Sequence, residues 1–414
     1  MHPANSSRLL SLDLVRGTAL LGILLLNIVG FGMPEAAYFN PRAYGGWHGA
    51  DLAAWLVNFL FFDGRMRGLF SFLFGASLLI VTDAAAAAGR DPARAHYARM
   101  GWLLVFGLAH LWLVWSGDIL AHYALVGMLA FPLRTLPVSR LLSLGTVLVL
   151  VSTALFGTFA HDAWRMSLLP QATQGGFTSL VNAFGMPSGA RIASELAVHR
   201  GSYAGVVGQR FGEYATSPFA MLLVYGWETL GYMLFGMAAL RSGLLTGAWP
   251  RETYRRWWLR CWAIALPIYA LLAIWLIAAK FSLFAVLMAA VTLPELIRPV
   301  MILGWACLIL YAARPEGWLT RRVAAAGRMA FSNYLATSLL CVWFFDGYGL
   351  GWFGYLSRWQ LYPVVLGVWA LLLLWSQPWL SVFRYGPLEW LWRSLARGSL
   401  QPIRNSLANR SQSH

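Results

Sequence analysis

The sequence predicts an all-α membrane protein, a polytopic bundle of about ten transmembrane helices with both termini in the cytoplasm. Of its 414 residues, 59% are hydrophobic and only 11% are charged, whereas about a quarter of the residues in a soluble domain are charged. Unbroken apolar runs of bilayer-spanning length occupy 141–160, 261–279 and 361–382. Because backbone groups find no water partner in lipid, such runs form helices or a closed barrel, and their lack of alternation favours helices.

Ten spans account for the apolar segments. We expect them at about 15–33, 66–82, 100–116, 119–136, 141–160, 219–240, 261–279, 297–313, 329–346 and 361–382. Cytoplasmic loops of membrane proteins are enriched in arginine and lysine. With the N-terminus inside, arginine clusters fall in the inner loops and the tail, whereas the outer connections 34–50 and 347–360 carry one arginine each. The arginines therefore support two cytoplasmic termini.

The chain is expected to form one integrated membrane domain with two halves. Residues 1–160 make the N-terminal membrane half, 219–382 make the C-terminal half, and 383–414 form a basic cytoplasmic tail. The insertion 161–218 is rich in Gly, Ser, Ala and Arg and is expected on the periplasmic side, either as a tolerated insertion or as a lid over a site. Residues 51–62 are too short to cross a bilayer and are expected at the outer interface.

The composition argues against nucleic-acid binding and against a metal site. The net charge is +15, but the arginines lie between the spans rather than on one soluble basic surface. Cys261, Cys307 and Cys341 lie in or beside apolar runs without metal-ligand spacing, so we expect packing roles and no metal. The chain has no nucleotide-binding glycine motif and no nucleophile elbow. Its first apolar run lacks a small-residue cleavage site and is expected to remain as an anchor.

The first span carries polar residues that lipid disfavours. An ionisable side chain inside a membrane costs about 2.5–3.5 kcal/mol on insertion scales, so it usually faces the bundle interior or water. Asp13 and Arg16 are three residues apart and share a face, and Asn27 returns to within about 20° of that face roughly 16 Å further along. This pattern fits a substrate-binding face. It also fits structural roles, in which Arg16 sets the topology and Asn27 bonds a neighbouring helix.

Two further groups are candidates for substrate binding. Asp63, Arg65 and Arg67 would lie at the outer end of the second span, where arginines run against the positive-inside rule. The two arginines could hold an anionic headgroup or substrate, or they could pair with Asp63. Near the start of the ninth span, Asn333 and Tyr334 add polar groups to an apolar helix.

The densest polar group lies around the outer turn between the third and fourth spans. His110 is within the third span, Asp118 is in the turn, and His122 and Tyr123 enter the fourth span. Asp118 and His122 are four residues apart, so the carboxylate can orient and charge the imidazole, as general-base chemistry on a hydroxyl or amine requires. A purely structural turn contact has the same spacing. The two histidines and the aspartate are also metal-ligand types, but their helical spacing does not demand a metal.

Several blocks together resemble one known family. They are RLLSLDLVRGTALLGILLLNI near the start, LFSFLFG, HLWLVWSGDILAHYALVG, and, in the C-terminal half, GRMAFSNYLATSLL and GPLEWLWR. In this order they resemble the YeiB family of bacterial inner-membrane proteins, also called domain-of-unknown-function family 418, over nearly the whole chain. The resemblance implies a multi-pass protein of the bacterial inner membrane.

The opening block is also similar to the first span of two groups of membrane acyltransferases, the acyltransferase-three and heparan-glucosaminide acetyltransferase types. These proteins move an acyl group from cytoplasmic acyl-CoA to an acceptor, often a sugar. In the first group an arginine is followed about ten residues later by a catalytic histidine; Arg16 matches the arginine, but Asn27 stands in place of the histidine. Heparan-type proteins also have Asn there and take their histidine from the following outer segment. His48 is the nearest counterpart here, and His122 with Asp118 is the next candidate.

The resemblance implies a transmembrane acyltransferase-like protein with acyl-CoA as co-substrate. Arg16 would hold coenzyme A phosphates, Asn27 would polarise the thioester carbonyl, and an outer histidine would take the acceptor's proton. One alternative is a transporter or flippase in which Arg65 and Arg67 recruit an anion; another is a relative that binds a ligand without catalysis. The expected partners are the lipid bilayer and a small-molecule or lipid-linked substrate, with aromatic surfaces that permit a homodimer.

Overall fold

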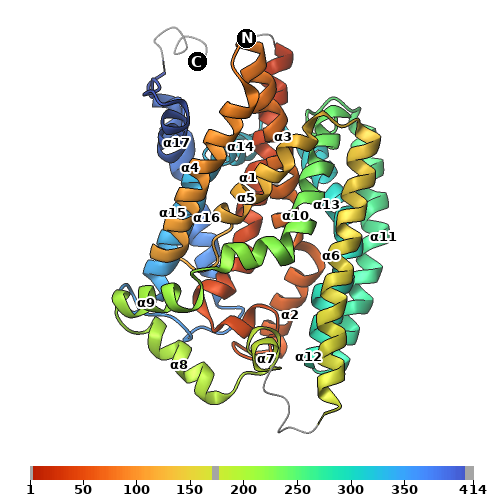
Figure 1. Cartoon of the computed structure of the whole chain (residues 1–414), viewed down its shortest axis with the longest axis vertical. Coiled ribbons are helices and arrows are strands. Elements are labelled where there is room, and N and C mark those ends of the chain that lie inside the picture. The colour runs from red at the N-terminus through yellow and green to blue at the C-terminus, as the bar shows by residue number, and fades with distance from the viewer. Residues whose placement is uncertain (1–2, 170–176, 406–414) are drawn as a thin grey trace.

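The computed structural model describes residues 3–169 and 177–405, and this part of the chain is helical with no strand (Figure 1). Within these residues, seven helical segments are long and apolar enough to cross a membrane: Leu10–Gly32, Gly49–Ala87, Val138–Ser167, Ser217–Arg241, Arg251–Ala278, Leu283–Ala312 and Leu361–Val382. The all-α fold is thereby confirmed, and these seven segments are candidate membrane spans. Each of the ten expected spans overlaps a helix, but the count of ten and the orientation of the termini stay predictions.

The α-helices follow one another along the chain, and the longest connections are 33–48 and 346–360. They are α1 (Pro3–Gly32), α2 (Gly49–Val57), α3 (Arg65–Ala87), α4 (Pro92–Leu113), α5 (Leu120–Ala130), α6 (Val138–Ser167), α7 (Thr178–Phe184), α8 (Gly189–His199), α9 (Tyr203–Glu213), α10 (Ser217–Arg241), α11 (Arg251–Ala278), α12 (Leu283–Ala285), α13 (Leu293–Ala312), α14 (Trp318–Arg328), α15 (Ala330–Phe345), α16 (Leu361–Val382) and α17 (Pro387–Arg397). Wider π turns, Asn58–Phe62 and Val286–Thr292, extend α2 and precede α13.

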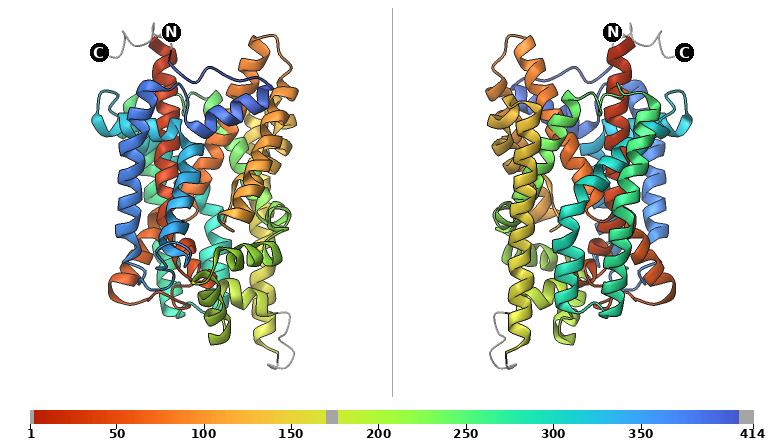
Figure 2. Two further views of the ribbon diagram at one scale, coloured as in Figure 1. Left: turned by 90° about the vertical axis from the view of Figure 1, so that its left-hand side faces the viewer. Right: turned by 90° about the vertical axis from the view of Figure 1, so that its right-hand side faces the viewer.

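The long helices run along the long axis of the molecule (Figures 1 and 2). The start of α1 and the C-terminal helix α17 lie at the same end, here called the terminal end, and α7, α8 and α9 lie at the opposite, far end (Figure 1). The expected insertion 161–218 therefore divides, because its first residues complete α6 and the remainder includes these three short helices. Residues 170–176 of the insertion and 406–414 of the tail lie outside the described residues.

The short segment before α3 is partly buried rather than lying wholly at an interface. Residues 51–62 fall in α2 and the following π turn, and Trp55 and Phe59 stack on each other with ring centroids 5.0 Å apart. Phe59 also meets Tyr269 of α11 edge-on. Asp63 and Gly64 then break the helix before α3 begins at Arg65.

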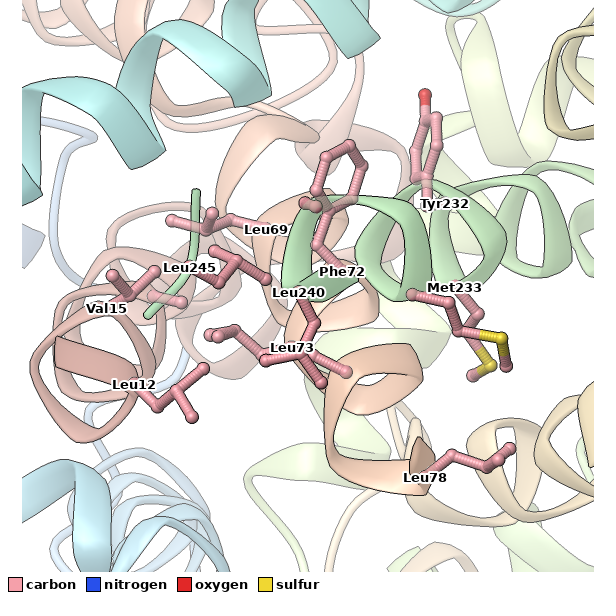
Figure 3. Close-up of a cluster of buried hydrophobic side chains, with 14 of the residues drawn as sticks. Leu12, Val15, Leu69, Phe72, Leu73, Leu78, Tyr232, Met233, Leu240 and Leu245 are labelled. Atoms are coloured by element: carbon pink, nitrogen blue, oxygen red, sulfur yellow. The ribbon is translucent and has the colours of Figure 1, made fainter. Parts of the chain in front are cut away.

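The centre of the bundle is the contact between α3 and α10. Its apolar side chains come from several helices and include Leu12, Val15, Leu69, Phe72, Leu73, Leu78, Tyr232, Met233, Leu240 and Leu245 (Figure 3). Glycines bring the two backbones together: a Cβ at Gly75 would lie 1.9 Å from the Met233 carbonyl oxygen, and one at Gly236 would lie 1.8 Å from that of Phe72. Small residues allow such close approach of helices in membranes.

Replacing Gly236 with alanine is therefore expected to destabilise the protein. The added methyl group meets backbone atoms that cannot rotate away, and overpacking typically costs about 1–3 kcal/mol. The apparent melting temperature in detergent, followed by tryptophan fluorescence, should fall. Gly101→Ala on α4 is the matched control, because nothing lies within 4 Å of a Cβ there, and equal melting temperatures for the two variants would contradict the close contact of α3 and α10.

Candidate functional site

Two cavities enter the bundle from opposite ends and meet inside it. The terminal cavity has a volume of about 1270 Å³ and lies among the first half of α1, α3, α4 and α14 to α17. The far cavity has a volume of about 400 Å³ and lies among the second half of α1, the start of α3, α5, α10, α13 and the short helices of the far end. Ile23, Ile119 and Tyr123 line both cavities, so these three residues form the boundary between them.

The terminal cavity is basic. Arg16 forms an ion pair with Asp13 at 2.7 Å and donates a hydrogen bond to the Ser77 hydroxyl at 3.2 Å, which confirms that Asp13 and Arg16 share one face of α1. The Arg99 guanidinium lies 4.0 Å from the centre of the Trp392 ring. In total, six arginines and two carboxylates line the cavity: Arg16, Arg99, Arg321, Arg328, Arg384 and Arg393, with Asp13 and Glu389.

The far cavity has the opposite balance of charged groups. Four carboxylates and two arginines line it: Glu35, Asp63, Glu195 and Glu295, with Arg67 and Arg298. Asn27 lies in the same wall and accepts a hydrogen bond from the Tyr38 hydroxyl at 3.3 Å. The aromatic rings of Trp115, Tyr123 and Tyr225 add apolar surface. Such a mixture of aromatic faces and fixed polar groups is typical of small-molecule sites.

A buried ion cluster forms one wall of the far cavity. Glu228 of α10 is fully buried and accepts hydrogen bonds from Arg67 of α3 at 2.7 and 3.0 Å and from Arg298 of α13 at 2.7 Å. Arg298 also forms an ion pair with Glu295 one turn earlier. Gly64 makes room for this cluster, since a Cβ there would lie 2.4 Å from the Arg298 Nε atom, and its positive φ of 69° suits glycine.

The arginines expected to bind an anion occupy two different environments. Arg67 lines the far cavity but is held by Glu228 rather than by Asp63. Arg65 is 1% exposed, lies with its guanidinium 3.6 Å from the centre of the Tyr269 ring, and donates to the Asp63 carbonyl oxygen. Arg65 does not line the cavity.

The expected pairing of Asp118 with His122 is wrong. One carboxylate oxygen of Asp118 bonds the His110 Nδ1 atom at 2.8 Å, and the other accepts from the Ala121 backbone N–H at 2.8 Å. The spacing rule for side chains four apart holds inside a helix, but Asp118 precedes α5 and its carboxylate caps the first turn. His122 instead points to α10, where its Nε2 atom lies 2.9 Å from the Thr229 hydroxyl.

The remaining histidine candidates differ in access to the far cavity. His122 lines it, and its buried Nδ1 atom has no partner. His110 is buried and lines neither cavity. His48 is exposed at the start of α2, packs against Trp47, and also lies outside both cavities. The structure therefore brings Asn27 together with His122 and not with His48.

The other candidate residues lie at the boundary and in the terminal half. The Tyr123 hydroxyl bonds the Ser71 hydroxyl at 2.8 Å and the Arg67 carbonyl oxygen at 3.1 Å. Tyr334 lines the terminal cavity, and its hydroxyl accepts from the Ile119 backbone N–H at 3.3 Å. Asn333 lines neither cavity; it bonds the Ala326 carbonyl oxygen and side chains of α16, which ties three helices together.

Sequence reasoning missed Glu228, Glu295 and Arg298 as site residues. A signal for them was present, because Glu228 is an acid within the apolar run 219–240, and intramembrane ionisable residues usually mark a functional interior. It also missed His199 of α8, which lines the far cavity. Among the described residues, no group of three or more His, Cys, Asp or Glu side chains is placed to hold a metal ion.

Comparisons with known proteins place the chain among bacterial relatives. A family model described as "Protein of unknown function (DUF418)" matches residues 239–399. "Uncharacterized protein YeiB" of Escherichia coli is 35% identical and covers 95% of this chain and 98% of its own length. "Uncharacterized protein YxaH" of Bacillus subtilis is 30% identical and covers 95% of both chains. No solved structure gives a significant match.

Replacing Glu228 with glutamine is expected to destabilise the protein strongly, because Arg67 and Arg298 would keep their charges without their shared carboxylate. Breaking one partner of a buried ion pair typically costs about 3–5 kcal/mol. Thermal unfolding in detergent measures this loss. Glu252→Gln is the control, since its carboxylate is half exposed and its pairs with Arg255 and Arg256 lie on one helix surface, where such pairs contribute less than about 1 kcal/mol.

A double-mutant cycle tests the histidine partners. Asp118→Ala combined with His110→Ala should show a coupling energy of about 0.5–3 kcal/mol, the range for side chains in direct contact. The same cycle with Asp118→Ala and His122→Ala should be close to additive. Strong coupling in the second cycle and additivity in the first would restore the pairing expected from the sequence.

Proposed function

The chain belongs to the YeiB family of membrane proteins, and from the two cavities we propose that it transfers an acyl group across the bacterial inner membrane. The donor is an acyl-coenzyme A bound in the terminal cavity with its thioester at the boundary between the cavities, and the acceptor is a hydroxyl or amine in the far cavity. The observation that carries this proposal is that a basic cavity and a largely acidic cavity share the boundary of Ile23, Ile119 and Tyr123.

The terminal cavity suits a large anionic donor. Coenzyme A carries three phosphate groups, and the planar fork of arginine matches phosphate oxygens in geometry and charge. The cavity volume of about 1270 Å³ exceeds the roughly 300–1,000 Å³ of ordinary small-molecule sites. The terminal end is the side expected to face the cytoplasm, where acyl-coenzyme A is present.

The far cavity suits a neutral or cationic acceptor. Its four carboxylates disfavour a phosphorylated ligand but can accept hydrogen bonds from hydroxyl or ammonium groups. Asn27 accepts from Tyr38 through its oxygen, which leaves the amide N–H groups to donate to the thioester carbonyl as negative charge develops there. The acceptor atom attacks the carbonyl carbon, its proton passes to a base, the C–S bond breaks, and coenzyme A leaves as a thiolate that takes a proton on the terminal side.

A transporter is the second candidate, because cavities from opposite ends that meet at one boundary also suit alternating access. It would move a bound anion between the two sides without breaking a thioester. Acetyl-coenzyme A uptake into proteoliposomes without release of free coenzyme A would favour transport. Binding with neither uptake nor release would favour a ligand-binding relative.

Purified protein in nanodiscs is expected to bind acetyl-coenzyme A, measured by calorimetry. Arg16→Ala should weaken binding by roughly 10- to 100-fold, since a hydrogen bond to a charged group contributes about 1.5–3 kcal/mol, and His122→Ala should retain it. Arg255→Ala is the matched control, because this arginine is half exposed and lies outside both cavities. Failure of the wild type to bind acetyl-coenzyme A would sink the acyl-transfer proposal.

A further inference from the structure

We infer that His199, oriented by Asp346, is the general base that takes the proton from the acceptor in the far cavity. This inference rests on the proposed transfer function and adds the residue that performs its proton step. His199 is the last residue of α8, and Asp346 follows the end of α15. The two residues are 147 positions apart in the sequence, and the fold joins them at the wall of the far cavity.

The imidazole of His199 is held in a fixed orientation. Its Nδ1 atom lies 2.8 Å from the Asp346 Oδ1 atom, and its ring stacks on Phe353 with centroids 4.2 Å apart and planes 11° apart. The backbone is fixed as well, because the Gly347 N–H donates to the His199 carbonyl oxygen at 2.7 Å. A carboxylate that accepts from Nδ1–H leaves the Nε2 atom, on the opposite side of the ring, as the proton acceptor.

The groups around Asp346 are a buried arginine and a phenol. Asp346 is 2% exposed, and its second oxygen lies 3.7 Å from the Arg210 Nη2 atom. Burial, and then the charge of Asp346, raise the pKa of Tyr348 above its ordinary value, so this phenol stays neutral beside the carboxylate. Glu195 lies one turn before His199 on α8 and Arg200 follows the end of this helix, and on the cavity side Glu35 and Tyr214 lie in the same wall.

Of the described histidines, only His122 and His199 line the far cavity. His122 is 3% exposed, and its imidazole has a hydroxyl partner, Thr229, rather than a carboxylate. The side chain of His199 is 22% exposed, so a proton taken from the acceptor can pass on to water at the far end. His199 therefore combines a carboxylate partner, a place in the cavity wall and an exit for the proton.

The step balances in atoms and charge. His199 Nε2 takes the proton from the acceptor O–H or N–H as that atom bonds to the thioester carbonyl carbon. The C–S bond breaks, and the coenzyme A thiolate is protonated by water in the terminal cavity. The imidazolium, stabilised by Asp346, returns its proton to water at the far end. General-base help of this kind typically contributes about 10²- to 10⁴-fold in rate.

The same contacts also attach α8 to the loop after α15. The experiment therefore has to distinguish a catalytic role of His199 from a role in this attachment. The assay follows release of free coenzyme A from acetyl-coenzyme A by nanodisc-embedded protein across pH, with glycerol as the hydroxyl probe. The wild-type rate should fall at acidic pH, because a protonated imidazole cannot accept a proton. His199→Gln should lose roughly 10²- to 10⁴-fold of the rate together with this acidic limb, while acetyl-coenzyme A binding stays unchanged. Added imidazole should restore part of the rate of His199→Ala.

Arg200→Gln is the matched control for anchoring. Arg200 donates to the Phe353 carbonyl oxygen at 2.9 Å and lies outside the cavity, so this variant weakens the same attachment and should keep the acidic limb of the pH profile. Equal rate losses in the two variants, or an acidic limb that persists in His199→Gln, would contradict the assignment of His199 as the base. Neither result would contradict the transfer function. A wild type that binds acetyl-coenzyme A but releases no free coenzyme A at any pH would contradict both the transfer function and the assignment of His199 as its base.

Discussion

The ion cluster of Glu228, Arg67 and Arg298 is the constraint on which the rest of the structure depends. A charged side chain inside a membrane is costly unless it has a partner, so the three helices that carry these residues cannot separate without leaving a charge alone. The shared carboxylate fixes α3, α10 and α13 relative to one another. The tight crossing of α3 and α10 at Gly75 and Gly236 helps to hold two of these helices together through backbone contact.

The cluster also lies next to the boundary between the two cavities. Tyr123 lies on that boundary, and its hydroxyl bonds the carbonyl oxygen of Arg67, the same residue whose side chain pairs with Glu228. The ring therefore has little freedom to swing aside while the cluster is intact. A boundary held in this way disfavours the wide exchange of access that transport requires, and it favours acyl transfer between a thioester and an acceptor that meet at the boundary.

The sequence predicts features that depend on neighbouring residues, but not contacts between residues that are far apart in the chain. Hydropathy is local, so the all-helical membrane fold could be predicted, and the Asp13–Arg16 pair could be predicted because both residues lie within one helix. The Asp118–His122 pairing failed because it applied a helical rule across the start of a helix. The contacts that define the far cavity join Arg67 to Glu228 and His199 to Asp346, more than 140 positions apart, and no spacing pattern in one sequence reveals them.

The insertion between the two membrane halves gains a role from these contacts. Glu195, His199 and Tyr214 line the far cavity, the Glu195 carboxylate accepts from the Glu35 backbone N–H at 2.9 Å, and the Tyr214 hydroxyl bonds the Glu35 carboxylate at 3.1 Å. A tolerated insertion would have no need to supply cavity walls. The short helices of the far end therefore support the lid of the two alternatives, and the proposed base His199 is the last residue of one of them.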